Sequence, residues 1–191
     1  MNRSQKITGL ILFALLAGKI YAGPPWKVSK ADIVIYGTSN LHDREMIVKV
    51  VKSQQNIVLS NGQLFIGNVD LTIPIQRIES GNSVMDGKAH DALKGSAYPA
   101  IRFTAGSTNL PVSGNAFGGT IRGRLEIAGV SKEIAIPVNG VVRSDKTLVL
   151  KGDYLIDMTV YGVKPPTALF GTLKTGKDVR VSFTFELAEM Q

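Results

Sequence analysis

The stretch "TLVLKGDYLIDMTV", residues 147–160, decides the fold because its apolar and polar side chains alternate. One face carries Lys151, Asp153 and Asp157, and the opposite face is apolar. A period of two over this length is typical of an antiparallel β-strand with one face in the core and the other in water. We therefore predict a strand whose core face consists of Leu148, Leu150, Tyr154, Ile156 and Met158.

The same alternation recurs along the chain, and turn residues separate the alternating segments. Turn signals lie at 60–62, 128–132, 143–146 and 174–177. Further strands are expected within 68–77, 101–105, 120–129, 132–140 and 178–187. About eight one-sided strands form either a sandwich of two sheets or a closed barrel, and the pattern alone does not choose between them. The predicted fold class is all-β.

Residues 82–95, "NSVMDGKAHDALKG", break the alternation. Asn82 or Ser83 can cap a helix, good helix formers follow, and Gly95 can end it. We expect one short helix here, inserted between strands. The sequence contains no internal repeat or linker, so residues 23–191 are predicted to form a single domain.

The first 22 residues, 1–22, have the layout of a Sec signal peptide. Arg3 and Lys6 precede an apolar run over 7–17, and the segment ends at Ala22. This run is short for a membrane span, so cleavage near Ala22 is favoured over a retained anchor. A periplasmic or secreted protein without a stable membrane span is the expected outcome.

Charge and cysteine content exclude further classes of protein. Without Arg3, Lys6 and Lys19, the 22 basic residues fall to 19 against 15 acidic residues, a net charge of +4. The excess is spread along the chain without a run of lysines or arginines, which argues against nucleic-acid binding. The chain has no cysteine, so burial and backbone hydrogen bonds must stabilise it without disulfides.

Each of the two histidines precedes an aspartate, as His42–Asp43 and as His90–Asp91. A metal site needs three or four ligands, and nothing in the spacing brings the two pairs together. A serine hydrolase is not indicated either, because the chain has no Gly-x-Ser-x-Gly motif. We predict no metal, no cofactor and no catalytic residue here, and interpret both pairs as residues that shape local structure.

Three blocks of sequence resemble the YceI family of secreted, lipocalin-like proteins that bind polyisoprenoid chains. They are "WKVSKADIVIYGTSNLHDREM" at 26–46, "LKGSAYPAIRFTAGS" at 93–107 and "GRLEIAGVSKEIAIPV" at 123–138. Arg44 occupies the position where one branch of the family usually has tryptophan. The resemblance implies an antiparallel, eight-stranded, lipocalin-like barrel with a helix against it and an elongated apolar pore. The implied ligand is a polyprenyl lipid or the tail of a quinone.

The apolar strand faces supply the candidate lining of this pore. An alternating face looks identical whether it encloses a cavity or fills a solid core, so the pore itself rests on the resemblance. The candidate ligand-binding residues are Leu71, Ile73, Ile101, Phe103, Ile121, Leu125, Ile127, Ile134, Ile136, Leu150, Tyr154, Ile156, Val181, Phe183 and Phe185. His42, His90 and Phe170 are candidates for the rim, where a headgroup would lie. Phe170 belongs to 161–177, a loop that either covers the rim or packs on the wall.

Three functions fit these features. The favoured one is a non-enzymatic protein that sequesters or carries a long-chain isoprenoid or similar lipid, because burying apolar surface contributes roughly 25 cal/mol per Å². The alternatives are a lipid-acting enzyme that uses His42 or His90, and a closed-core barrel that serves as a protein-interaction module. The expected partner is a hydrophobic small molecule, and a homodimer is left open.

Overall fold

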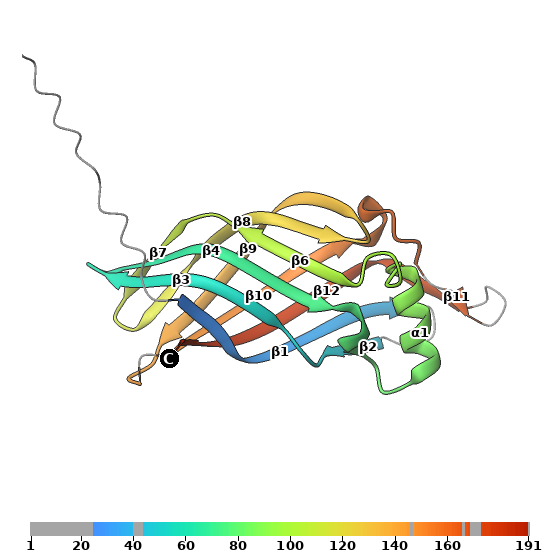
Figure 1. Ribbon diagram of the computed structural model, residues 1–191, viewed down its shortest axis with the longest axis horizontal. Helices are drawn as coiled ribbons and strands as arrows, with labels where there is room; N and C mark the ends of the chain where they lie inside the picture. The colour runs from blue at the N-terminus through green and yellow to red at the C-terminus, as the bar shows by residue number, and fades with distance from the viewer. Residues whose placement is uncertain (1–24, 40–43, 146, 166, 169–172, 191) are drawn as a thin grey trace, which may run out of the picture.

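The computed structural model describes residues 25–39, 44–145, 147–165, 167–168 and 173–190. An antiparallel β-sheet closes on itself into an eight-stranded barrel, and a short α-helix lies at one end of it (Figure 1). The lipocalin-like barrel implied by the family resemblance is therefore confirmed. The sandwich, which the alternation had left open, is excluded by this closure.

Six strands of the barrel wall are continuous. They are β1 (Pro25–Ser39), β4 (Gln63–Pro74), β8 (Ala116–Ile127), β9 (Val130–Val142), β10 (Leu148–Asp157) and β12 (Leu173–Glu189). Two further positions in the wall are each shared by two segments, β2 (Arg44–Val48) with β3 (Lys52–Ser60) and β6 (Ala100–Ala105) with β7 (Thr108–Ser113). The remaining elements are β5 (Ile78–Glu79), β11 (Thr167–Ala168), η1 (Ile75–Arg77), η2 (Met158–Tyr161) and α1 (Ser83–Ala92).

The barrel closes where the first strand meets the last. β1 pairs with β12 along nearly its whole length, from Trp26 opposite Glu189 to Ser39 opposite Thr175. On its other side, β1 pairs with β3 only at 25–26 and with β2 only over 34–37. Between these two paired segments, a side chain links β1 to β3, because the Ser53 hydroxyl accepts a hydrogen bond from the Val28 amide at 2.8 Å.

One predicted turn is wrong. The segment 174–177 lies within β12 instead of ending a strand. Lys174 pairs with Thr167 on one side, and Thr175 pairs with Ser39 on the other, so the backbone stays in the sheet. Gly176 coincides with an irregularity in the β1–β12 register, which is a role that glycine also has in strands.

Glycines inside two strands lie beneath aromatic rings. Gly152 on β10 is directly opposite Phe183 on β12. A Cβ atom at Gly152 would lie 2.5 Å from Phe183 Cζ and 2.9 Å from the Pro137 carbonyl oxygen. Gly140 on β9 stands in the same relation to Phe117 on β8. A ring folded over a glycine allows a strongly curved sheet to pack without a gap.

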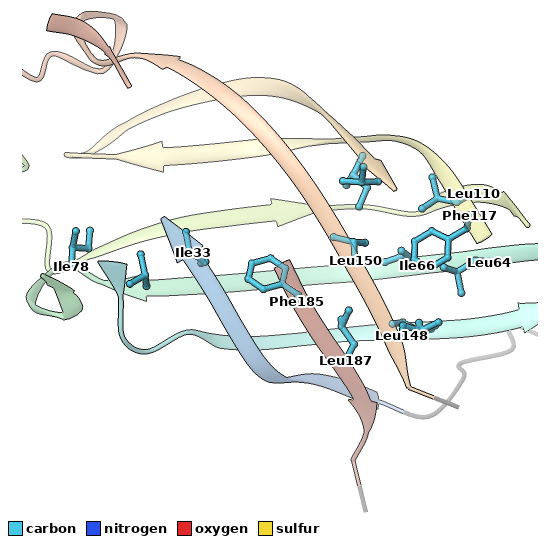
Figure 2. Close-up of a cluster of buried hydrophobic side chains, with 14 residues drawn as sticks. Ile33, Leu64, Ile66, Ile78, Leu110, Phe117, Leu148, Leu150, Phe185 and Leu187 are labelled. Carbon is cyan, nitrogen blue, oxygen red and sulfur yellow. The ribbon is translucent and has the colours of Figure 1, made fainter. Parts of the chain in front are cut away.

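The end of the barrel away from α1 is filled by side chains. Its core comprises buried residues from five strands, with Leu64 at 0% and Leu110 at 1% relative exposure. Figure 2 shows Leu64, Leu110 and Phe117 close together, with Ile33 and Ile78 on the opposite side of the view. We call the following residues the plug: Ile57, Leu64, Leu110, Phe117 and Leu148.

An apolar cavity as the candidate functional site

A cavity of about 400 Å³ occupies the barrel interior between the plug and α1. Side chains of β1, β2, β3, β4, β5, β6, β8, β9, β10 and β12 form its wall, and α1 contributes from the end. This volume lies within the range of roughly 300–1,000 Å³ that is typical of small-molecule sites. The plug residues do not belong to its lining, so the cavity is closed at that end.

All residues that the sequence nominated for the pore line this cavity. They are Leu71, Ile73, Ile101, Phe103, Ile121, Leu125, Ile127, Ile134, Ile136, Leu150, Tyr154, Ile156, Val181, Phe183 and Phe185. Alternation explains this placement, because every second side chain of an antiparallel wall strand points inward. Their role in binding a ligand stays a prediction.

The structure adds lining residues that the sequence reasoning missed. They come from strands β1, β2, β4, β5, β9 and β12, from α1 and the residue after it, and from η2 with the residues after it. The additional apolar residues are Val28, Ile33, Ile35, Met46, Val48, Ile66, Val69, Ile78, Met85, Ala89, Ala92, Leu93, Val138, Met158, Tyr161, Val163, Val179 and Leu187. The signals were present, because "DIVIYG" alternates, and Met85, Ala89 and Ala92 repeat at helical spacing.

Helix α1 forms because its first turn is capped. The Asn82 side chain accepts hydrogen bonds from the Val84 and Met85 amides, both at 3.1 Å. The Ser80 hydroxyl and amide both donate to Asp86, and these hydrogen bonds lower the pKa of Asp86 below its ordinary value. The cap fixes the start of the helix and turns its small, apolar face towards the cavity.

His90 holds α1 against the wall. Its Nε2–H donates a hydrogen bond of 2.9 Å to the Ile78 carbonyl oxygen on β5, since a carbonyl can only accept. His90 does not line the cavity, and its neighbour Asp91 is exposed. This geometry agrees with a role in local structure. The other rim candidates, His42 and Phe170, lie outside the described residues.

Polar groups are few in the cavity lining. Lys88 on α1 is exposed and also lines the cavity, so the cavity reaches the surface beside the helix. Tyr161 is buried, and this burial, together with nearby Tyr154, raises the pKa of its hydroxyl to about 12. Among the described residues, Gln55 is the buried polar residue of the wall, with 4% relative exposure. The interior is therefore apolar and close to neutral.

The described part of the chain offers no cluster of three or more histidine, cysteine, aspartate or glutamate residues that could hold a metal ion. Within the same residues, no helix has the length and apolar character needed to cross a membrane.

A closed antiparallel barrel around an apolar cavity defines the class of lipocalin-like proteins. The model of the YceI-like domain matches residues 33–187, so this chain belongs to the YceI-like family. No curated protein matches the sequence.

Solved structures share this fold at low sequence identity. A polyisoprenoid-binding domain from Saccharophagus degradans has a TM-score of 0.66 and 14% identity, covering 86% of this chain and 98% of its own. BcnA from Burkholderia cenocepacia has a TM-score of 0.66 and 17% identity, covering 84% and 98%. The YceI protein of Campylobacter jejuni has a TM-score of 0.56 and 19% identity, covering 81% and 85%. At these identities, the likeness shows a shared fold.

Proposed function

We propose that this protein is a non-enzymatic binding protein that holds a long-chain isoprenoid or a similar lipid inside the barrel. The observation that carries the proposal is the cavity of about 400 Å³ with an almost wholly apolar lining. The structural relative from Saccharophagus degradans is described as polyisoprenoid-binding, which supports the same class of ligand.

The energetics favour a hydrocarbon chain. Each methylene transferred from water into an apolar site contributes about 0.8 kcal/mol, so a chain of several isoprene units needs few hydrogen bonds to bind well. A polar or charged molecule would lose its hydration and gain little from aliphatic walls. The open side beside Lys88 provides a route for the chain to enter.

The predicted signal peptide indicates where the protein works. We propose that the mature chain, after cleavage near Ala22, works in the periplasm or outside the cell. A prenyl lipid is poorly soluble there, so a barrel that shelters it could transport it, store it or protect it. All three roles use the same site.

The two alternatives have less support. An enzyme using His90 would need an imidazole ring that faces the ligand, whereas this ring donates a hydrogen bond to the Ile78 carbonyl oxygen on β5. A closed-core interaction module would need a filled interior, whereas the half of the barrel next to α1 is hollow.

The first test is direct identification of a bound lipid. We expect native mass spectrometry of the purified mature protein to show a lipid adduct, and organic extraction to release a prenyl compound. A protein isolated empty should take up added prenyl lipid in a titration. An empty protein that also ignores added prenyl lipids would contradict the proposal.

A filled cavity should abolish binding while the barrel persists. Leu125 lines the cavity at 8% relative exposure, so Leu125→Trp places an indole where the chain would lie. Overpacking is expected to cost about 1–3 kcal/mol of stability. The matched control is Leu155→Trp, which adds the same ring at a site with 64% relative exposure. Only the first variant should lose lipid affinity, measured by titration, with circular dichroism as the check on folding.

A further inference from the structure

The lining of the cavity ends abruptly at the plug. On β3, β4, β8 and β10, the last lining residue is followed along the strand by a plug residue as the next inward side chain. The pairs, with the lining residue first, are Gln55 and Ile57, Ile66 and Leu64, Ile121 and Phe117, and Leu150 and Leu148. Because these strands lie at different positions around the barrel, the plug forms a floor across the cavity and not a narrowing of one wall.

The floor is close-packed. Leu64 is 0% exposed and Leu110 is 1% exposed, and Figure 2 shows both beside Phe117. A Cβ atom at Gly119 would lie 2.7 Å from Leu110 Cδ2, so Leu110 packs directly on the backbone of β8. Protein interiors packed in this way resist compression. A ligand chain that reaches the plug therefore meets a fixed end.

Above the floor, the largest side chains leave the centre of the barrel open. Phe183 covers Gly152, and Phe103 covers Gly123 in the same manner, because a Cβ atom at Gly123 would lie 2.7 Å from Phe103 Cζ. Both rings therefore lie along the wall and not across the interior. The space from the floor to the opening beside Lys88 is one continuous cavity.

The depth of this cavity determines how much of a chain it holds. Along β10 the lining runs from Leu150 to Ile156, and along β12 from Val179 to Leu187. With about 3.2–3.4 Å per residue and a strand tilt of about 35–45°, these spans give a depth of about 15–20 Å. An isoprene unit adds four carbon–carbon bonds of about 1.5 Å, so it advances less than about 6 Å. About three or four isoprene units therefore fill the cavity.

A chain enters this cavity with its apolar end first. The plug offers only aliphatic and aromatic groups, whereas the opening lies beside the exposed ammonium group of Lys88. A polar head keeps its hydration at the opening and would lose it at the floor. An eight-stranded barrel is just wide enough for one slender ligand, so the chain has no room to fold back beside itself.

Resting on the proposed lipid-binding function, we propose that the plug is a chain-length stop. The cavity encloses about three or four isoprene units, and the remainder of a longer chain stays outside the opening. Leu64, Leu110 and Leu148 set this limit from below, and Ile121 lies directly above it. These side chains are thus specificity-determining residues for the length of the bound chain, whatever its head group.

The test is a series of prenyl alcohols that share one head group and differ in length. Geraniol, farnesol, geranylgeraniol and geranylfarnesol, in order of increasing length, are titrated into the delipidated mature protein. Displacement of a fluorescent fatty-acid probe gives each affinity. We expect affinity to rise at least about tenfold with each added unit while the chain still gains buried surface. It should stop rising at geranylgeraniol, because further units remain in water.

Two variants should move this plateau in opposite directions. Leu110→Ala deepens the cavity, so geranylfarnesol should gain about tenfold in affinity while geraniol and farnesol bind as before. Ile121→Phe raises the floor, so geranylgeraniol should bind no better than farnesol. The matched control is Leu71→Ala, the same truncation in the side wall, which should weaken binding without moving the plateau. Thermal unfolding checks that each barrel is folded, and Ile121→Phe serves as the test if Leu110→Ala does not fold.

The outcomes separate this proposal from the proposed function. If none of the alcohols binds the wild-type protein, lipid binding itself fails. If affinity keeps rising through geranylfarnesol, the chain-length stop is overturned while lipid binding stands. A plateau that a folded Leu110→Ala or Ile121→Phe variant leaves in place, or that Leu71→Ala moves equally, would also overturn it.

Discussion

At the scale of single residues, His90 illustrates a side chain whose predicted role in local structure agrees with its hydrogen bond to the backbone. Replacing His90 with alanine removes the hydrogen bond to the Ile78 carbonyl and leaves that oxygen without its partner. We expect a loss of about 1 kcal/mol in the free energy of unfolding, with lipid affinity largely unchanged. Chemical denaturation and lipid titration measure the two effects.

Asp91→Ala is the control, because Asp91 is exposed beside His90 and should change stability little. A large loss of lipid affinity in His90→Ala, with the fold intact, would contradict the structural role. It would instead support the hypothesis that His90 contacts the headgroup of the lipid.

At the scale of elements, η2 shows why the strand predicted over 147–160 stops early. The Asp157 side chain accepts a hydrogen bond from the Thr159 amide at 2.9 Å and so caps η2. The chain leaves the sheet at Met158, and Tyr161 and Val163 become part of the cavity lining. Asp157 also accepts a 2.8 Å hydrogen bond from Lys177 on β12, which ties η2 to the wall.

This contact should make the stability of the protein depend on pH. The Lys177 ammonium, followed by Thr159, lowers the pKa of Asp157 from 3.8 to about 2 in the folded state. Asp157 and then Asp178 raise the pKa of Lys177 from 10.5 to about 12. The carboxylate contribution is therefore complete above pH 3.8 and is lost as the pH falls through 2. The lysine contribution is complete below pH 10.5 and is lost as the pH rises through 12.

Thermal unfolding of wild-type protein and of Asp157→Asn across this acid range provides the measurement. The difference in Tm should be largest at neutral pH and should shrink as Asp157 is protonated. An Asp157 carboxyl that titrates near 3.8 by NMR would show that the pair with Lys177 does not persist in solution.

At the scale of the whole molecule, the barrel divides into a solid half that stabilises the fold and a hollow half that is available to a ligand. Leu110 in the plug is 1% exposed and does not line the cavity, whereas Leu71 is partly buried and does. We expect Leu110→Ala to cost about 2–5 kcal/mol of stability while lipid affinity changes little.

Truncating Leu71 to alanine should affect lipid affinity more than stability, the opposite of Leu110→Ala. Leu71→Ala removes part of the cavity wall, so it should weaken lipid binding more and destabilise the apo protein less than Leu110→Ala. Denaturant unfolding and lipid titration of both variants test this division. Equal losses of affinity in the two variants would show that the plug and the cavity are not independent.

Much of the wall was predictable from local patterns, but β1, β2, β3 and β7 lie outside the segments expected to be strands. Strands such as β10 and β12 alternate cleanly, so their inward residues were assigned correctly to one face. β3 escaped detection because its inner positions are Ser53, Gln55 and Ile57, two of them polar. The polar inner positions that hide β3 also place inside the barrel the Gln55 amide, whose Nε2 has no hydrogen-bond partner among the described residues.

The sequence by itself determined the all-β class, the position of the helix and which face of most strands is apolar. It did so because alternation and helix capping are local properties of the chain. Only the tertiary structure decided that these faces surround a cavity at one end and a plug at the other. That outcome depends on closure of β1 onto β12, and on which inward side chains are large enough to meet across the barrel. Both are contacts between residues far apart in the chain, so a local pattern does not encode them.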